Sequence, residues 1–174
     1  MNFAITHDKS KNLAGTIIFA VFTFIAAYKF SIGFELFFAL LVTREALVTY
    51  FLFTRHPGQI KIPLWQNVIA YTSSAMPLIY ASATPDLSDS YMVPWKVIII
   101  MGFTLSTLAL IDLGQSFGVS PQKRGKIIRS GVYKFLSHPM YTGYILMEVG
   151  MIALNIDSNF YIFVVSLILY LIRI

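Results

Sequence analysis

Between Val93 and Leu113 the chain reads VPWKVIIIMGFTLSTLALIDL, a run in which Lys96 and Asp112 are the charged residues. An α-helix rises about 1.5 Å per residue, so about 20 residues cross a hydrocarbon core that is about 30 Å thick. This stretch is therefore long and apolar enough to form a transmembrane helix, and it indicates an all-α membrane fold.

The whole chain has the composition of a membrane protein. Of its 174 residues, 57% are apolar and 12% are charged, and the mean hydropathy is +0.71. Soluble domains are typically about 45–50% apolar and about 25% charged. A disordered chain and a compact soluble enzyme are therefore excluded as leading interpretations, and the length suits a single domain over residues 1–174.

Further apolar segments lie on both sides of this helix. Polar links separate them, and Asp157-Ser158-Asn159 leaves room only for a tight turn between the last two. The sequence therefore predicts a polytopic membrane helical bundle of about six segments, in which the last two form a short helical hairpin. The expected segments are 13–28, 32–53, 64–83, 93–113, 140–155 and 160–174.

Lysines and arginines are distributed unevenly between the loops of this bundle. If the N-terminus lies in the cytosol, ten of them fall on the cytosolic side and only Lys29 and Lys96 on the other. Cytosolic loops of membrane proteins carry such an excess. The sequence therefore predicts a multi-pass protein in contact with membrane lipids, whose N-terminus and 114–139 loop are cytosolic. The same distribution argues against nucleic acid as a partner, and the sequence leaves the oligomeric state open.

Several kinds of chemistry are excluded by residue type. The chain has no cysteine, so disulfides, thiolate zinc sites, iron–sulfur clusters and cysteine nucleophiles are absent. Its three histidines are too scattered, and too far from spaced carboxylates, to form a metal site. No metal is expected.

The 114–139 loop concentrates unusual residues, including Gly114, Gly118, Gly131, Tyr133 and His138. Glycines let a backbone approach a ligand closely, while aromatic and basic side chains can contact an adenine ring or an anionic group. A basic loop beside a membrane can equally serve only to fix topology and to contact acidic lipids. Composition alone leaves both interpretations open.

The order of residues in this region favours the ligand-binding interpretation. Leu113-Gly114-Gln115-Ser116-Phe117 is followed by Ser130-Gly131-Val132-Tyr133 and by Ser137-His138-Pro139-Met140-Tyr141-Thr142-Gly143. This pattern resembles the isoprenylcysteine carboxyl methyltransferase and phospholipid methyltransferase superfamily of integral membrane enzymes. Its hallmarks are Leu-Gly-x-x-Phe, a Gly-Pro-Tyr stretch and Arg-His-Pro-x-Tyr-x-Gly. The resemblance covers residues 112–174.

The resemblance implies an S-adenosylmethionine-dependent methyltransferase that acts on a lipophilic or small acceptor, with residues 112–174 as the cofactor-binding part. Two positions depart from the family pattern: Ser137 replaces the arginine before His-Pro, and Val132 replaces the usual proline. Lys134 or Arg129 is a candidate replacement for the lost charge. The residues that match the family's cofactor-binding positions are Gly131, Tyr133, His138, Pro139, Tyr141 and Gly143.

The resemblance also gives a role to the C-terminal helix. In this family that helix ends in an arginine, here Arg173, and leads into a cytosolic segment with a Glu-Glu pair that these 174 residues do not contain. Arg173 is therefore expected to take part in catalysis. The missing pair predicts either that the chain continues beyond Ile174 or that part of the family's catalytic tail is lost.

Arg44 and Glu45 lie in the second apolar segment, where charged side chains are costly and mark partners or functional sites. Arg44 has two candidate partners, Glu45 itself and Glu148 in the fifth segment. One interpretation is a structural ion pair between the helices. The other places these residues at the inner wall of a substrate pocket, where Glu45 or Glu148 takes a proton in catalysis.

Two alternative functions remain at this point. A small non-catalytic membrane scaffold would keep the fold after losing the catalytic tail. A sterol-reductase-like enzyme would use a nicotinamide cofactor, although such chains are longer. The similar-looking Arg55-His56-Pro57-Gly58 lacks the tyrosine two residues after proline, and it is expected to be an interfacial anchor that ends the second helix.

Overall fold

The computed structural model of the chain describes residues 2–33, 35–56, 58, 62–84, 86–120, 124 and 127–173, and for residues 2–12 it describes the backbone alone. In this part of the chain it contains helices and no strands, so the predicted all-α fold is confirmed. The α-helices are α1 (Asn2–Gly33), α2 (Leu36–Thr54), α3 (Leu64–Ala75), α4 (Asp89–Leu113), α5 (Pro139–Leu154) and α6 (Ile156–Arg173). Short 3₁₀ turns are η1 (Met76–Ile79), η2 (Gly114–Ser116) and η3 (Gly131–Lys134).

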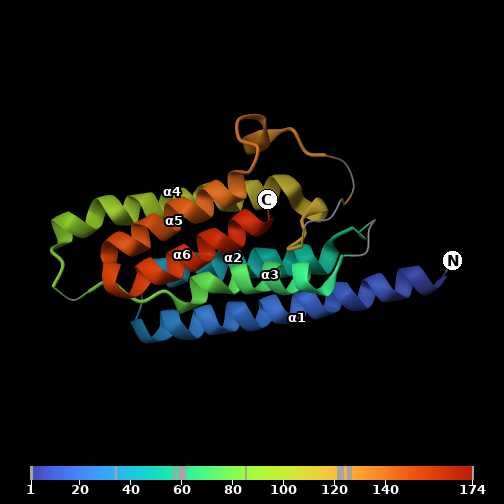
Figure 1. Cartoon of the computed structure of the whole chain (residues 1–174), viewed down its shortest axis with the longest axis horizontal. Coiled ribbons are helices and arrows are strands. Elements are labelled where there is room, and N and C mark those ends of the chain that lie inside the picture. The colour runs from blue at the N-terminus through green and yellow to red at the C-terminus, as the bar shows by residue number, and fades with distance from the viewer. Residues whose placement is uncertain are drawn as a thin grey trace.

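The helices form an elongated bundle in which successive helices run back and forth along the long axis (Figure 1). The N-terminal end of α1, the C-terminal end of α2, the start of α3 and the turn η3 all lie toward one end of the bundle. The main helix contacts join α1 to α2, α4 to α5, α5 to α6 and α3 to α6. The alternating direction of successive helices agrees with the hydropathy pattern of a multi-pass protein.

Among the residues that the structure describes, four helices are long and apolar enough to cross a membrane. They are Leu13–Gly33 within α1, then α2, α4 with η2, and α6. With 16 residues, α5 is about 24 Å long and forms with α6 the predicted short hairpin. The prediction of a turn at Asp157-Ser158-Asn159 is wrong. The break between α5 and α6 falls at Asn155, and these three residues lie in α6.

The third segment also differs from the prediction, since α3 ends at Ala75 rather than at Ala83. Pro77 follows within η1, and its ring and missing N–H disfavour a continuing α-helix. The non-helical backbone beyond it is held by the fully buried Asn159, whose side-chain amide bonds both the N–H and the carbonyl of Ala81 at 2.8 and 3.1 Å. Thr84 N–H donates to the Leu154 carbonyl at 3.1 Å. Irregular backbone at membrane depth requires such internal partners.

The contact between α4 and α5 depends on glycines. A Cβ atom at Gly143 would lie 2.6 Å from the Gly102 carbonyl oxygen and 2.8 Å from the Ser106 nitrogen. A Cβ atom at Gly102 would lie 2.5 Å from the Gly143 carbonyl oxygen. Glycines at facing positions thus let the two backbones touch, as small residues do in membrane helix pairs. This contact fixes the start of α5 against α4.

Candidate functional site

A cavity of about 160 Å³ lies where α5 and α6 meet α1 to α4 and the loop after α4. Its walls combine apolar side chains with cationic and phenolic groups. The lining residues are Phe19, Arg44, Val48, Ser74, Leu113, Phe117, Gly118, Val119, Tyr133, Ser137, His138, Met140, Tyr141, Tyr144 and Arg173. Such a mixture of apolar walls and a few convergent polar groups is typical of small-molecule sites.

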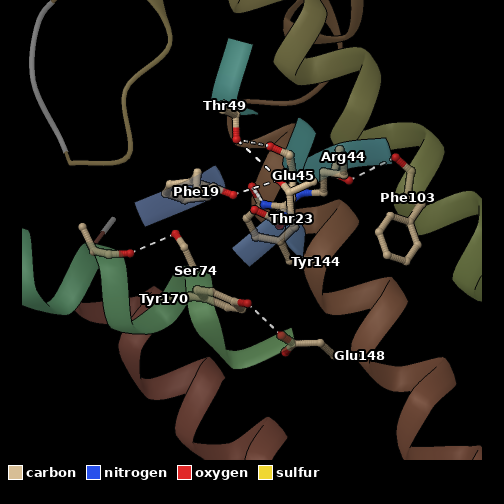
Figure 2. A network of polar contacts seen from close by, with 12 residues as sticks. Phe19, Thr23, Arg44, Glu45, Thr49, Ser74, Phe103, Tyr144, Glu148 and Tyr170 are labelled. Atoms are coloured by element: carbon tan, nitrogen blue, oxygen red, sulfur yellow. Dashed lines mark hydrogen bonds and ion pairs between the residues drawn. The ribbon is translucent and has the colours of Figure 1, made fainter. Parts of the chain in front are cut away.

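Arg44 provides a buried cation in this wall. It forms an ion pair with Glu45, and its Nη2 donates to the Tyr144 hydroxyl oxygen at 2.5 Å (Figure 2). Its guanidinium also lies over the Tyr144 ring, 4.4 Å from the ring centroid. The carboxylate partner is therefore Glu45, while the link from α2 to α5 runs through Tyr144 and not through Glu148.

Three tyrosines form an aromatic cluster between α5 and α6. The rings of Tyr141, Tyr144 and Tyr170 have centroids 5.7–6.1 Å apart. Arg173, at the end of α6, lies with its guanidinium 5.5 Å from the Tyr141 centroid. The cavity thus has two arginines next to an aromatic wall, Arg44 at Tyr144 and Arg173 at Tyr141, an arrangement that can hold an anionic group next to a flat ring.

Arg173 also ties α6 to its neighbours. It donates to the Ser73 hydroxyl of α3 and, at 2.6 Å, to the Val119 carbonyl in the loop after α4. The same loop is joined to α3 by Ser120, whose hydroxyl donates to Asn67 at 2.5 Å. These bonds position the loop, whose Gly118 and Val119 line the cavity.

Behind the aromatic cluster lies a second buried carboxylate. The Tyr170 hydroxyl donates to Glu148 Oε1 at 2.7 Å, and both residues are almost fully buried (Figure 2). Glu148 is not among the cavity-lining residues. Tyr170 is not among them either, but its ring packs against Tyr141 and Tyr144, which do line the cavity, so Glu148 lies two contacts away from it.

Asp112 shapes the loop before α5. Its Oδ2 accepts the Val132 N–H at 2.8 Å, and Gly131 sits directly against this carboxylate with φ of 58°. A side chain at Gly131 would collide with Asp112. Residues with a Cβ atom also rarely adopt the left-handed conformation that Gly131 has. Tyr133 then turns into the cavity wall, where burial, aided by Tyr144, Asp112 and Tyr141, raises the pKa of its hydroxyl. Tyr133 is therefore a neutral hydrogen-bonding group at physiological pH.

The structure brings together some of the residues selected from sequence and separates others. Four of them line the cavity: Tyr133, His138, Tyr141 and Arg173. Five lie outside the lining. They are Gly131 beside Asp112, Pro139 at the start of α5, Gly143 in the α4–α5 contact, Glu45 beside Arg44, and Glu148 behind Tyr170.

The sequence-based selection missed several lining residues. Phe117 lines the cavity and belongs to the Leu-Gly-x-x-Phe motif, so it could have been selected from the sequence. Phe19, Val48 and Tyr144 look like ordinary membrane residues, so only the packing of the helices reveals them. The candidate replacement cations, Lys134 and Arg129, are absent from the lining. Of the second His-Pro pair, His56 is exposed and is not among the lining residues, and Pro57 lies outside the described residues.

Metal chemistry finds no support in the described part of the chain. Over those residues, no three histidine, aspartate or glutamate side chains gather closely enough to hold an ion. The cavity therefore offers cations, phenols and apolar surface, which suit an organic anion or an amino-acid-bearing cofactor.

The part of the chain that is similar to a known protein family is also the part that contributes most of the cavity lining. Residues 95–174 match the model of the isoprenylcysteine carboxyl methyltransferase family. This part of the chain, somewhat less than half of its length, is similar to that family. The resemblance inferred from the motifs around His138 is thus confirmed.

Two curated relatives come from rice, Oryza sativa subspecies indica and japonica, and both are named probable protein-S-isoprenylcysteine O-methyltransferase. Each is 31% identical over a match of 72 residues, and the match covers 38% of this chain and 38% of the relative. The match therefore spans well under half of those proteins. No solved structure matches the chain.

Proposed function

We propose that this protein is an integral membrane methyltransferase that moves a methyl group from S-adenosylmethionine to a lipophilic acceptor. The observation that carries the proposal is the cavity in which Tyr133, His138 and Tyr141, from the family motifs, lie together with two arginines. The acceptor that best suits this site is a carboxylate of the isoprenylcysteine type, in line with the names of the rice relatives.

The residues present fit the proposed cofactor. Its carboxylate matches Arg44 or Arg173, each of which has an Nε–H without a hydrogen-bond partner among the described residues. Its cationic sulfonium matches the faces and oxygens of Tyr133 and Tyr141. Phe117, Val119 and Leu113 supply apolar surface for an adenine ring. When bound, the cofactor would supply a methyl group already activated by its sulfonium leaving group.

The residues of the chain then have mainly a positioning task. A carboxylate acceptor needs no general base, because its oxygen is nucleophilic as it stands. The tyrosine cluster and the apolar walls exclude water and align the acceptor, and alignment of this kind can supply much of the rate enhancement. In this scheme Glu45 and Glu148 hold Arg44 and Tyr170 in place, and Arg173 orients an anionic group beside Tyr141.

The bundle end that carries the N-terminus and the 114–138 loop is proposed to face the cytosol. The excess of basic residues at that end supports this orientation, and the cavity lies next to the same loop. A soluble cofactor would enter from that end, while a lipophilic acceptor would enter from the bilayer.

The orientation can be tested with single cysteines, because the chain has none of its own. Ser130→Cys and Ser88→Cys are suitable, since both serines are exposed, Ser88 directly precedes α4 and Ser130 directly precedes η3, on the far side of that helix in the chain. In sealed inside-out vesicles, a membrane-impermeant maleimide should label the cysteine at 130 and leave the one at 88 unlabelled. Labelling of both from one side would contradict the proposed topology.

Cofactor binding can be tested by calorimetric titration with S-adenosylmethionine and S-adenosylhomocysteine. His138→Ala and Tyr141→Phe should each weaken binding, because losing one hydrogen bond to a charged group costs about 1.5–3 kcal/mol, or roughly 10- to 150-fold in affinity. His56→Ala is the matched control, since His56 is an exposed histidine before a proline and lies outside the cavity.

Two results would argue against this function. If the wild-type chain does not bind either ligand at millimolar concentration, the methyltransferase proposal fails and the scaffold interpretation gains support. If His56→Ala and His138→Ala weaken binding equally, the cofactor site is not the cavity at the start of α5.

A further inference from the structure

Arg44 lines the cavity although it lies outside residues 95–174, the part of the chain that the family comparison covers. It projects from the middle of α2 and is only 3% exposed. A charged side chain within a membrane bundle is costly, and such a residue usually either pairs with an opposite charge or belongs to a functional site. Glu45 is one such partner. Whether Arg44 can also bind a ligand depends on the N–H groups that its guanidinium has left.

The hydrogen bonds of Arg44 leave donors free. A guanidinium has five N–H groups, of which Nη1 donates to Glu45 and Nη2 to Tyr144. Its Nε–H has no partner among the residues that the structure describes. Because the Tyr144 ring lies 4.4 Å away and fixes the plane of the guanidinium, the remaining N–H groups are held in the fork geometry that matches a carboxylate.

The charges around the cavity point to the same ligand chemistry. Arg44 and Arg173 both line the cavity, whereas Arg173 bonds to two neutral groups, the Ser73 hydroxyl and the Val119 carbonyl. Glu45 is the carboxylate that forms an ion pair with either arginine in the described part of the chain. Arg173 therefore has no carboxylate in contact among the described residues, and Glu148, the other buried carboxylate near the cluster, bonds to Tyr170 and does not line the cavity, so the lining itself offers two cations to an anionic group.

We propose that Arg44 receives the carboxylate of a ligand in this cavity and makes the site selective for carboxylate-bearing ligands. The identity of those ligands rests on the proposed function, because S-adenosylmethionine and an isoprenylcysteine acceptor both carry a carboxylate. Tyr144 is then a positioning residue, which acts by fixing the guanidinium. The experiment below tells the two sources of the carboxylate apart.

The test uses the double variant Arg44→Gln/Glu45→Gln of the full 174-residue chain in detergent micelles. Removing both charges together avoids leaving a single buried charge, so the variant is expected to fold. Two carboxylate ligands are titrated separately, S-adenosylhomocysteine and N-acetyl-S-farnesylcysteine. The affinity for one of them should fall roughly 10- to 150-fold, as expected for a lost charge-assisted hydrogen bond.

Matched ligands without the carboxylate identify its source. 5′-Methylthioadenosine and the carboxamide of the farnesylcysteine analogue should bind the variant and the wild type alike. A selective loss for S-adenosylhomocysteine assigns Arg44 to the cofactor, and a selective loss for the farnesylcysteine analogue assigns it to the acceptor. Arg129→Gln, at an exposed arginine outside the cavity, should bind every ligand as the wild type does.

Equal affinity of the variant and the wild type for both carboxylate ligands would overturn the inference, as would a wild type that binds neither of them. If the wild type binds the farnesylcysteine analogue through Arg44 but does not bind S-adenosylhomocysteine, methyl transfer fails as the function while the inference stands. If the double variant does not fold, Arg44→Lys replaces it, because it keeps the charge beside Glu45 but loses the fork. Unchanged affinity of Arg44→Lys for both carboxylates would then overturn the inference.

Discussion

Arg44→Ala is expected to destabilise the protein by about 3–5 kcal/mol, the usual cost of removing one member of a buried ion pair. The substitution leaves the Glu45 carboxylate, 1% exposed, without its cation, and it removes the bond from α2 to Tyr144 of α5. The change should be measured as the loss of unfolding free energy in detergent micelles, followed by circular dichroism against denaturant.

A double-mutant cycle separates the ion pair from other effects of the truncation. Glu45→Ala alone should also be strongly destabilising. The loss of unfolding free energy in Arg44→Ala/Glu45→Ala should be smaller than the sum of the losses in the two single variants. Unchanged stability of Arg44→Ala together with lost ligand affinity would contradict a structural role and would leave Arg44 with a binding role alone.

The type of fold was predictable because hydropathy reports directly on the membrane. Val93 to Leu113 reads as a single apolar helix, and the structure places α4 over this stretch. The third helix was predicted too long, since the residues after Pro77 are apolar as well, although Pro77 itself disfavours a continuing helix. What holds the non-helical backbone beyond Pro77 was not predictable, because its hydrogen bonds come from Asn159, which is distant in sequence. Local hydrophobicity contains no information about such a partner.

The candidate site was predictable where a motif fixes a turn or the start of a helix. His138 and Tyr141 follow from the pattern at the start of α5, and both line the cavity. Tyr144 and Phe19 carry no such signal, because aromatic residues are common in membrane helices. Their place in the site depends on how α1 and α5 pack, which is a tertiary property.

Gly143 is a motif residue for which the structure shows a packing contact that the motif does not mention. The resemblance makes it a cofactor-binding residue, whereas the structure places it where α5 touches the backbone of α4. A helix-packing role explains glycine at this position without any ligand, since a side chain would fall within 3 Å of Gly102 and Ser106. The two roles predict different outcomes for the same substitution.

Gly143→Ala is expected to destabilise the protein by about 3 kcal/mol, at the upper end of typical overpacking costs. The new methyl group would meet the Gly102 carbonyl at 2.6 Å and the Ser106 nitrogen at 2.8 Å, and backbone atoms cannot move aside as a flexible side chain can. The higher helix propensity of alanine offsets about 1 kcal/mol at most. The measurement is the unfolding free energy in detergent, with S-adenosylhomocysteine affinity determined on the same samples.

Gly33→Ala is the matched control, because a Cβ atom there would meet only the Glu35 side chain, at 3.4 Å or more, on an exposed helix end. Its stability should equal or slightly exceed that of the wild type. A Gly143→Ala protein that keeps full stability but loses affinity for S-adenosylhomocysteine would refute the packing role. Such a result would mean that Gly143 lets the backbone approach the cofactor, so that α4 and α5 must be able to move apart by the width of a methyl group. Lost stability in Gly143→Ala, with Gly33→Ala unaffected, would instead establish that the glycine serves the helix contact on which the cavity is built.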